Sequence, residues 1–281
     1  MMAEDEREIS KINDLMNPKG KIVWVTGASS GIGEALALRM AAEGARLILS
    51  ARREDGLRKA RKRCEEEGAQ ARILPLDLAD LASLPAKADA AWALFGGVHI
   101  LVNNGGIGQR ATAMETNLHI DKTIMDVNYF GTIALTKAIL PKMIGQGGGQ
   151  IVVTSSVLGK FGVQTRSAYA ASKHALHGFF DALRCEMAIA GHPIRITLIC
   201  PGWVQTNLSL EALKGDGTRH GRMDAGQGKG MSPEEFAGKM CKAIAKGKDE
   251  VVIGGIEARG VSVKRLFPSL LNKILPKVKV S

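Results

Sequence analysis

Thr26-Gly27-Ala28-Ser29-Ser30-Gly31-Ile32-Gly33 is the stretch that decides the fold of this 281-residue chain. An apolar run at 22–25 precedes it and a helical pattern at 34–40 follows it, which predicts a strand, a glycine-rich turn and a helix. Glycine adopts backbone angles closed to other residues and lets the main chain approach a phosphate or a neighbouring element. A helix N-terminus offers free N–H groups and a positive dipole end to a pyrophosphate. The stretch therefore predicts a dinucleotide site, with an ordinary glycine turn as the alternative.

The rest of the chain repeats this alternation of strand and helix. Apolar, β-branched runs predict strands at 21–26, 45–50, 71–76, 99–103, 150–155, 194–200 and 250–254. Helical patterns lie near 31–43, 54–67, 80–95, 119–144, 167–190 and 233–246. Such alternation predicts an α/β fold, a single Rossmann-type doubly wound domain with a central parallel sheet of about seven strands and helices on both faces. Ligands of such sheets bind beyond the carboxyl ends of the strands.

We divide the chain into an N-terminal extension at 1–20, a nucleotide-binding domain at 21–255 and a basic amphipathic tail at 256–281. The glycine-rich segment 207–231 inside the domain predicts a substrate lid, with a disordered excursion as the alternative. The tail mixes apolar side chains with lysine and arginine. It predicts either an amphipathic contact with an anionic membrane surface or packing on its own domain or on a sister subunit.

Composition limits the partners of this chain. The net charge is +10, but aromatic residues make up only 4% and acidic residues follow the basic run 52–63 directly, so we expect a solvated helix face and no nucleic-acid partner. No apolar run is long enough to span a membrane, and the acidic N-terminus resembles no secretory or transit signal. The four cysteines lie far apart without metal-ligand spacing, so we expect no disulfide framework, no metal and a cytoplasmic location.

Arg52 and Arg53 close the second predicted strand, about twenty residues beyond the glycine turn, where an NAD-specific site wants a carboxylate for the ribose 2′-hydroxyl. No carboxylate precedes Glu54 here. Because an arginine pair suits a 2′-phosphate, the sequence predicts NADP(H) in preference to NAD(H). A solvent-exposed arginine pair without a ligand is the alternative.

Three further strand ends carry candidate cofactor contacts. Asp77 is placed to accept from an adenine amino group or, alternatively, to cap a helix. Asn104 and Gly105 form a turn that lets backbone lie against the adenosine ribose, or a plain tight turn. After the sixth strand, the Val204 backbone is placed to meet the nicotinamide carboxamide and Thr206 to reach a cofactor phosphate, with an ordinary loop as the alternative.

Tyr169 and Lys173 begin a helical pattern, and their spacing of four puts them on one helix face. An ammonium stabilises a phenolate, so Lys173 is predicted to lower the pKa of Tyr169 from its ordinary value of about 10 toward that of a general acid–base group. Ser156 ends the fifth strand, placed to donate to a substrate oxygen or to cap a turn. Asn128 interrupts a long helical pattern, which indicates a water-holding role or a helix kink.

Taken in order, these residues resemble the short-chain dehydrogenase/reductase family, over about residues 20 to 255. The resemblance rests on the turn 26–33, the Tyr169–Lys173 spacing and the Pro201-Gly202 pair. The chain looks most like the branch of SDR family members 7 and 7B, with matching stretches at 49–53, 74–78, 103–106 and 171–176. One departure is Asn103-Asn104-Gly105-Gly106, where the family usually has Asn-Asn-Ala-Gly, and it loosens one contact.

The resemblance implies hydride transfer between nicotinamide and a carbonyl or secondary alcohol carbon. Its implied catalytic residues are Asn128, Ser156, Tyr169 and Lys173, and its implied cofactor contacts are Gly27, Ser29, Ser30, Gly31, Ile32, Gly33, Arg52, Arg53, Asp77, Leu78, Asn104, Gly105, Tyr169, Lys173, Val204 and Thr206. Lys173 would also hold the nicotinamide ribose, and Asn128 a water. Relatives pair through the helices that begin near Asn128 and Tyr169, which implies a homodimer or homotetramer.

The substrate is expected to be a small carbonyl or alcohol of apolar, lipid-like character. Val157, Phe161 and Trp203 predict an apolar wall beside Ser156, so Ser156 and Trp203 are the candidate substrate contacts. The alternative function is a non-catalytic, NADP-binding regulatory protein with the same fold.

Overall fold

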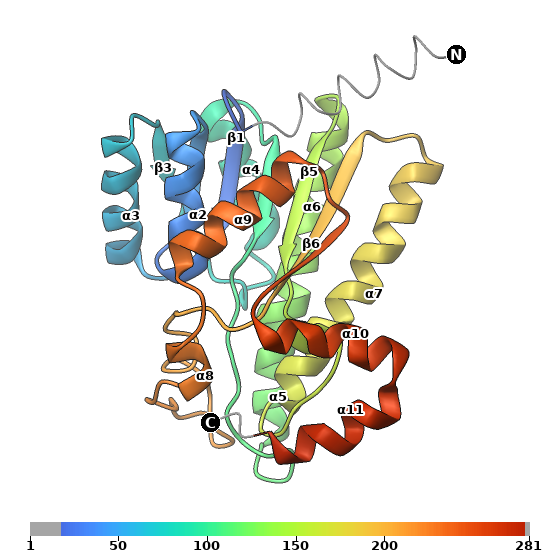
Figure 1. Ribbon diagram of the computed structural model, residues 1–281. Helices are drawn as coiled ribbons and strands as arrows, with labels where there is room; N and C mark the ends of the chain where they lie inside the picture. Colours follow the sequence, from blue (N-terminus) through green and yellow to red (C-terminus); the bar gives the residue numbers. More distant parts are fainter. Residues whose placement is uncertain (1–17, 279–281) are drawn as a thin grey trace.

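A seven-stranded sheet forms the centre of the computed structural model, which describes residues 18–278 (Figure 1). All its strands are parallel, in the order β3-β2-β1-β4-β5-β6-β7. The strands are β1 Ile22–Thr26, β2 Arg46–Ser50, β3 Ala71–Ile73, β4 Ile100–Asn103, β5 Gly149–Thr154, β6 Ile194–Pro201 and β7 Glu250–Ile253. The predicted α/β fold with about seven parallel strands is confirmed. Residues 1–17 of the predicted extension and residues 279–281 of the predicted tail lie outside the described residues.

The strand order reverses at β1, where Val25 pairs with Leu49 of β2 on one side and with Val102 of β4 on the other. The chain crosses from β3 back to β4 at this point, so the connections after β1 and β4 leave in opposite directions along the sheet. A crevice at the carboxyl ends of these strands is the usual ligand site of a doubly wound sheet.

Helices cover both faces of the sheet (Figure 1). One face carries α2 Gly31–Ala42, α3 Glu54–Glu66 and α9 Pro233–Ala245, and the other carries α4 Leu84–Phe95, α6 Gly131–Gly145 and α7 Ser167–Ile189. The first layer buries Leu36, Met40, Phe236 and Met240 against the sheet, and the second buries Leu135, Ile139, Leu176 and Phe180. Central strands such as β5 are buried along their whole length, as expected for a sheet covered on both faces.

Three predicted boundaries are wrong. β3 ends at Ile73 rather than residue 76, close to Pro75, which has no N–H for a sheet ladder. α4 begins at Leu84 rather than residue 80, with Pro85 in its first turn, where a missing N–H costs little. The predicted helix 119–144 consists of α5 Leu118–Met125, the π-helical turn η1 Asp126–Phe130 and α6.

The segment 207–231, which we call the lid after its predicted role, folds against the domain, and its role over a substrate stays a prediction. It contains the short helix α8 Ala225–Gly228, and Val204 and Met231 form a bridge that closes its base. The tail forms η3 Ile256–Ala258, α10 Arg259–Leu266, α11 Pro268–Ile274 and η4 Leu275–Lys277. Leu271 of α11 packs on Val157 and Phe161 beside the end of β5, so the tail is docked on its own domain. Between residues 18 and 278, the helices include none of the length and apolar character needed to cross a bilayer.

Candidate active site

The glycine turn lies between β1 and α2 and has the shape predicted for it. Gly27 and Gly31 have φ of +67° and +60°, a region that favours glycine. A Cβ on Gly33 would lie 2.3 Å from the Gly27 carbonyl oxygen and 2.6 Å from Asn104 Nδ2, so only glycine lets α2 come this close. Ser30, the N-cap, makes no side-chain capping bond. The first turn of α2 thus presents its N–H groups to the crevice in the manner of an anion site.

Asn104 fastens the strand ends around this turn. Its backbone N–H donates to Thr26 Oγ1 at 3.0 Å, its Nδ2 donates to the Thr26 carbonyl at 3.2 Å, and its Oδ1 accepts from Thr154 Oγ1 at 3.2 Å. Gly105 lies so close to Leu78 that a Cβ would be 2.7 Å from Leu78 Cδ1. The Asn104 side chain therefore holds β1, β4 and β5 together, and backbone at 104–105 faces the crevice.

Arg52 and Arg53 are exposed and follow β2 at the same edge of the sheet. Arg53 Nη1 lies 3.7 Å from Glu211 Oε1 of the lid, and the two side chains are 59% and 39% exposed. Asp77 Oδ1 accepts from the Ala79 N–H at 3.0 Å within a turn, and α4 begins only at Leu84 with Ser83 as its N-cap, so Asp77 does not cap a helix. The structure brings these residues to the edge that holds the glycine turn.

Tyr169, Lys173 and Ser156 come together at the carboxyl ends of β4 and β5. Tyr169 and Lys173 occupy the first turns of α7 and are 9% and 5% exposed. Lys173 Nζ donates to the Thr154 carbonyl at 2.8 Å and lies 5.7 Å from the centre of the Tyr169 ring. Ser156 follows β5, and its Oγ accepts the Leu158 N–H at 3.1 Å, as the turn-capping alternative predicts. A side-chain hydrogen bond from Ser156 also works to lower the pKa of Tyr169. A phenol, a hydroxyl and an ammonium thus lie together at the carboxyl end of β5.

The predicted cause of an acidic Tyr169 is wrong in this structure. Burial raises the pKa of Tyr169, although a hydrogen bond from Ser156 and the positive charges of Arg110 and Arg166 work against it. Burial also lowers the pKa of Lys173 to about 8, because the ammonium has left water. Desolvation is therefore the largest influence on both groups, and the groups that oppose it at Tyr169 are Ser156, Arg110 and Arg166 rather than Lys173.

Asn128 lies in the π-helical turn and is fully buried. Its Oδ1 accepts from the Ile107 N–H at 2.8 Å, and its Nδ2 donates to the Ile107 carbonyl and to Ser172 Oγ, each at 3.0 Å. The side chain thus joins the loop after β4 to α7. The helix irregularity that we gave as the alternative is present, and the water-holding role stays a prediction.

Four residues that sequence reasoning missed lie directly beside Tyr169. Gln109 Oε1 accepts the N–H groups of Ala168 and Tyr169 at 2.8 and 3.4 Å. Arg110 and Arg166 both donate to Asp224 of the lid, with Nε–Oδ2 and Nη2–Oδ2 distances of 2.8 Å. The partners are 114 and 58 residues apart in the chain, so no local pattern points to them.

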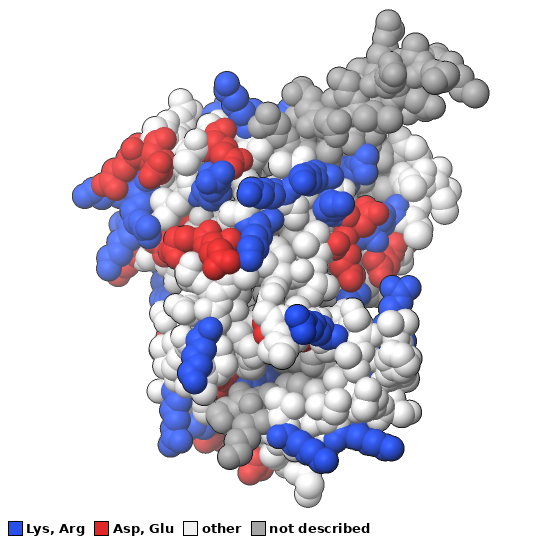
Figure 2. Space-filling model, viewed as in Figure 1, with Lys and Arg blue, Asp and Glu red and all other residues white. Residues whose placement is uncertain are grey.

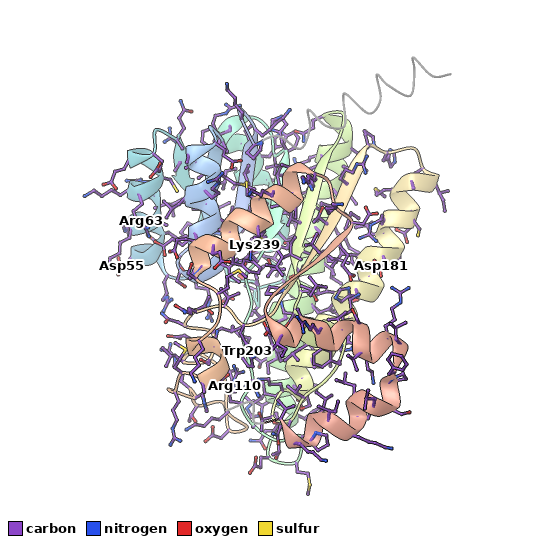
Figure 3. All side chains as sticks on the ribbon, viewed as in Figure 1. Asp55, Arg63, Arg110, Asp181, Trp203 and Lys239 are labelled. Atoms are coloured by element: carbon purple, nitrogen blue, oxygen red, sulfur yellow. The ribbon has the colours of Figure 1, made fainter. Side chains whose placement is uncertain are left out.

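The predicted contacts after β6 lie at the base of the lid. A Cβ on Gly31 would lie 3.0 Å from Thr206 Cγ2, and Thr206 Oγ1 accepts from Gln227 Nε2 at 2.7 Å. Val204 is buried in the bridge to Met231. The Trp203 ring lies 5.9 Å from the Arg166 guanidinium, and Figure 3 labels Trp203 and Arg110 in the region between α8 and α10. Thr206 and Trp203 therefore belong to the same closed side of the crevice.

The predicted apolar wall is only partly correct. Val157 and Phe161 are 5% and 6% exposed and pack on Leu271 of the tail. A Cβ on Gly260 of α10 would lie 3.0 Å from the Phe161 ring, so α10 covers this ring closely. Val157 and Phe161 thus support the tail, which leaves Trp203 as the predicted wall residue at the crevice.

A polar cluster lies behind the site, on the far side of Lys173. His177 Nε2 is 2.9 Å from Ser155 Oγ and 3.8 Å from Cys200 Sγ, while His177 Nδ1 is 3.3 Å from Glu250 Oε2. Ligand atoms of His177, Cys200 and Glu250 lie within 4.8 Å of one another. Contacts with His177 and with Lys160 lower the pKa of Glu250 to about 2, so protein donors already use this carboxylate. The absence of a metal site stays a prediction.

Comparison with known proteins shows similarity to the short chain dehydrogenase family. Residues 21–216 match the short chain dehydrogenase family. A dehydrogenase/reductase SDR family protein 7-like protein of Anopheles gambiae is 44% identical over 98% of this chain and 86% of its own length. The dehydrogenase/reductase SDR family member 7B of Xenopus tropicalis is 40% identical over 89% of this chain and 82% of its own length.

Solved structures of similar shape carry both forms of the nicotinamide cofactor. A short chain dehydrogenase/reductase from Burkholderia phymatum in complex with NAD superimposes with a TM-score of 0.81 at 26% identity, covering 90% of this chain and 96% of that one. An alcohol dehydrogenase from Thermococcus sibiricus complexed with 5-hydroxy-NADP has a TM-score of 0.73 at 25% identity, with coverages of 85% and 98%.

Proposed function

Because this chain belongs to the short-chain dehydrogenase/reductase family, in the branch of members 7 and 7B, we propose that it is an NADP(H)-dependent reductase of apolar carbonyl compounds. The family makes it an oxidoreductase with a nicotinamide cofactor. The observation that carries the proposal is the meeting of Tyr169, Ser156 and Lys173 at the carboxyl end of β5, in a sheet whose strands β1 and β4 end at the glycine turn and at Asn104. Carbonyl reduction is the proposed direction because cellular NADP pools are mostly reduced.

The crevice fits such a cofactor. A Cβ on Gly27 would lie 3.0 Å from Asn104 Nδ2 and the Gly105 Cα, and Gly33 is tighter still, so only glycine lets the turn pack on the end of β4. Gly31 and Thr206 line one pocket at the start of α2, where helix N–H groups suit a pyrophosphate. When bound, the cofactor supplies or accepts the hydride. We propose that the turn from Gly27 to Gly33 holds the pyrophosphate with Thr206, that Asp77, Leu78, Asn104 and Gly105 line the adenosine, and that the Val204 backbone meets the carboxamide.

The protein side chains then handle the proton. Tyr169 donates its phenol proton to the carbonyl oxygen during reduction and takes it back during oxidation. Ser156 donates a hydrogen bond to the same oxygen and holds it in place. The Lys173 ammonium lies 5.7 Å from the ring, where its charge favours the phenolate that remains after the proton has left. Lys173 is further proposed to bind the nicotinamide ribose, and Asn128 to keep α7 aligned with the loop after β4.

The preference for NADP(H) rests on Arg52 and Arg53. Both are exposed at the end of β2, where a carboxylate that would favour NAD(H) is absent from 50–53. Exposed guanidinium groups form bidentate contacts with a 2′-phosphate, and the weak Arg53–Glu211 pair at 3.7 Å does not prevent this. The apolar character of the substrate rests on Trp203 and on the predominantly apolar tail beside the site.

The test compares NADPH oxidation by the wild type and by Tyr169→Phe, with a panel of carbonyl compounds of increasing apolar size. Loss of a general acid is expected to lower kcat/KM by about 10²–10⁴-fold. The chain has two tyrosines, so Tyr129→Phe is a matched control that should keep its activity. Equal rates for the wild type and Tyr169→Phe would end the catalytic proposal and favour the regulatory alternative.

We also propose that the tail binds an anionic membrane surface. Leu266, Phe267 and Leu270 of α10 and α11 are 67%, 60% and 50% exposed, although Leu271 is buried. Residues 258–278 contain five basic side chains and no acidic one. In Figure 2 the surface over α10 and α11 is largely uncharged with separate blue groups, unlike the mixed blue and red surface over α2, α3 and α9. Apolar side chains with basic neighbours are typical of helices that lie in a membrane interface.

Flotation with vesicles tests this contact. The wild type should float with vesicles that contain anionic lipid and not with neutral ones, and Leu266→Glu/Phe267→Glu should remain in the soluble fraction. Ile189→Glu is the matched control, because Ile189 is also an exposed apolar residue, 87% exposed, but lies at the C-terminal end of α7 and outside the tail. If the double variant floats like the wild type, the tail does not bind membranes. We also propose a homodimer or homotetramer, and light scattering of the wild type without vesicles measures the molar mass that tests it.

A further inference from the structure

Three charged side chains from separate segments meet in the interior above Tyr169. Arg110 follows β4, Arg166 is the N-cap of α7, and Asp224 belongs to the lid. The side chains of Arg110, Arg166 and Asp224 are 6%, 2% and 0% exposed. Both arginines donate to the same carboxylate oxygen, Asp224 Oδ2, at 2.8 Å. Two buried cations thus share one buried anion, and the cluster carries a net charge of one positive unit.

Both arginines are tied to the turn that carries Tyr169. Arg166 is the residue from which α7 starts, three positions before Tyr169. Arg110 follows Gln109, whose amide oxygen accepts the N–H groups of Ala168 and Tyr169 and whose Nε2 donates to Thr116 Oγ1. A displacement of either arginine therefore displaces the backbone of Tyr169.

Asp224 ties the lid to the same place. Within 207–231 it is the only charged side chain that is buried. Ser209 Oγ accepts the Asp224 N–H at 3.3 Å, so the carboxylate is also anchored within the lid. The Trp203 ring at the base of the lid lies 5.9 Å from the Arg166 guanidinium. The lid thus reaches the catalytic helix through charge as well as packing.

We propose that Arg110, Arg166 and Asp224 form a latch that closes the lid over the site and sets the positive charge facing the Tyr169 hydroxyl. The latch residues are positioning residues, because they act through Tyr169 and not on the substrate. The inference rests on the proposed role of Tyr169 as the proton donor.

The charges around Tyr169 determine in which direction the latch moves the pKa of this phenol. Lys173 lies one turn further along α7, Ser156 donates from the end of β5, and the latch supplies the remaining charge. Burial raises the pKa of Tyr169, and Arg110 and Arg166 oppose that rise. Burial alone would raise the pKa of Asp224, but its bonds to Arg110 and Arg166 hold it below its ordinary value, so it remains a carboxylate.

His220 is the other titratable group at the latch. Its Nε2 lies 3.9 Å from Asp224 Oδ1, and burial together with Arg110 lowers its pKa, which leaves it neutral near pH 7. Among the described residues, Asp224 Oδ1 has no hydrogen-bond partner. Withdrawal of the lid would remove the carboxylate and leave two cations facing the phenol. A docked lid therefore keeps Tyr169 protonated, which suits the acid in carbonyl reduction, and an open lid makes it more acidic.

The test titrates Tyr169 directly in the cofactor-free protein. In a Tyr129→Phe background, ¹³Cζ-labelled tyrosine gives a single NMR signal that reports its ionisation. Removal of one charge near the phenol is expected to move its pKa by about half a unit or more. Arg110→Met should raise this pKa, Asp224→Asn should lower it, and the double variant Arg110→Met/Asp224→Asn, whose net charge equals that of the wild type, should return it close to the wild-type value.

A second measurement separates charge from structure. Hydrogen exchange of residues 207–231 should rise in Arg110→Met, in Asp224→Asn and in the double variant, because each removes bonds of the latch. In Arg110→Met the remaining Arg166–Asp224 bond keeps the carboxylate in place, so the Tyr169 pKa still rises. Arg110→Lys keeps the charge and should leave the pKa of Tyr169 unchanged. The comparison of Arg110→Lys with Arg110→Met therefore keeps the test decisive if Asp224→Asn does not fold. Shifts of the same sign in Arg110→Met and Asp224→Asn, or no shift in Arg110→Met, would overturn the latch. Neither readout needs turnover, so inactivity of the wild type toward carbonyls would refute the proposed function separately.

Discussion

The cofactor half, residues 21–78, and the substrate half, residues 107–231, are built on different physical principles. In the cofactor half the only buried polar side chains are those of Thr26 and Ser50, and ion pairs such as Arg39–Glu43 and Arg58–Glu54 lie at the surface. The substrate half buries Asn128, Lys173, Arg166 and Asp224. The cofactor half therefore depends on the shape of its backbone, and the substrate half on charges held out of water.

This difference teaches which kind of substitution each half tolerates. A backbone cradle is damaged by added atoms, because there is no space for a Cβ where the main chain must approach a ligand or a strand. A buried polar network is damaged by loss of a partner, because a charge or donor left alone in the interior keeps its desolvation penalty. Substitutions that add atoms should thus be most harmful near Gly33, and those that remove charge near Lys173.

Gly33→Ala should have the largest effect. The new Cβ would lie 2.3 Å from the Gly27 carbonyl oxygen, which is backbone and cannot rotate away. The start of α2 must shift, and we expect a loss of about 1–3 kcal/mol in the free energy of unfolding. NADPH binding, followed by the fluorescence of the dinucleotide, should weaken by about 100-fold, because the turn loses its fit to the pyrophosphate.

Gly178→Ala is the matched control for this substitution. Gly178 is exposed in the middle of α7, and a Cβ there meets nothing within 4 Å. Alanine favours a helix over glycine by about 0.5–1 kcal/mol, so this variant should be as stable as the wild type or more so. Equal NADPH affinity in Gly33→Ala and Gly178→Ala would contradict the idea that the cofactor half depends on backbone shape.

Lys173→Met tests the buried charge of the substrate half. Burial lowers the pKa of Lys173 from 10.5 in the unfolded chain to about 8 in the folded protein. The unfolded chain therefore binds more protons between these values, so the free energy of unfolding rises as the pH rises through this range. Between pH 7 and pH 9 the wild type should gain about 1 kcal/mol over Lys173→Met.

Urea unfolding of the wild type and of Lys173→Met at the two pH values measures this gain. Both proteins contain the same buried thiols, so the thiol contributions cancel when the free energy of one protein is subtracted from that of the other. Lys242→Met is the control, because Lys242 is exposed on α9 and should show no such gain. A wild-type advantage that stays the same at pH 7 and pH 9 would mean that Lys173 is not desolvated in solution.

The sequence predicts the cofactor half better than the substrate half, for the same physical reason. The turn from Gly27 to Gly33 and the strands around it follow from neighbouring residues, and the Tyr169–Lys173 pair follows from helical spacing. The Arg110–Asp224–Arg166 cluster joins residues that are 114 and 58 positions apart, so its existence follows only from the folded lid.

The extent to which the site residues are buried could not be predicted from the sequence either. Spacing correctly places Lys173 near Tyr169, but only the fold shows that desolvation is the largest influence on the pKa of each group. The π-helical turn at Asn128 likewise depends on distant partners, Ile107 and Ser172. From its place after β5, Phe161 is predicted to line the apolar wall of the substrate site, but in the structure it packs on the tail.

Arg52→Ala/Arg53→Ala should have a smaller effect, confined to the cofactor half. Exposed arginines contribute to binding only through their contacts with the ligand, so the fold should be unchanged within about 0.5 kcal/mol. Loss of two charge-assisted contacts should weaken NADPH binding by about 10–100-fold and leave NADH binding nearly unchanged. Arg58→Ala, also exposed on α3, is the control. Equal losses for NADPH and NADH would contradict the proposed preference for the 2′-phosphate.

Glu211→Gln should have the smallest effect, because it breaks the one charge contact that we find between the two halves. Arg53 Nη1 lies 3.7 Å from Glu211 Oε1, and both side chains are well exposed. Glu211 also pairs with Arg219 of the lid at 3.3 Å. Exposed pairs of this kind are screened by water and contribute about 0–1 kcal/mol, so the free energy of unfolding should change by less than about 0.5 kcal/mol.

The sign of its effect on binding is still informative. Loss of the carboxylate releases Arg53 and removes a negative charge near the proposed 2′-phosphate, so NADPH affinity should rise slightly, by less than about threefold. The gain should shrink as salt is added, since exposed charges are screened within about 10 Å at moderate ionic strength. A fall in NADPH affinity, or an effect as large as that of Asp224→Asn on lid exchange, would show that the two halves are coupled through this surface pair and not only through the buried latch.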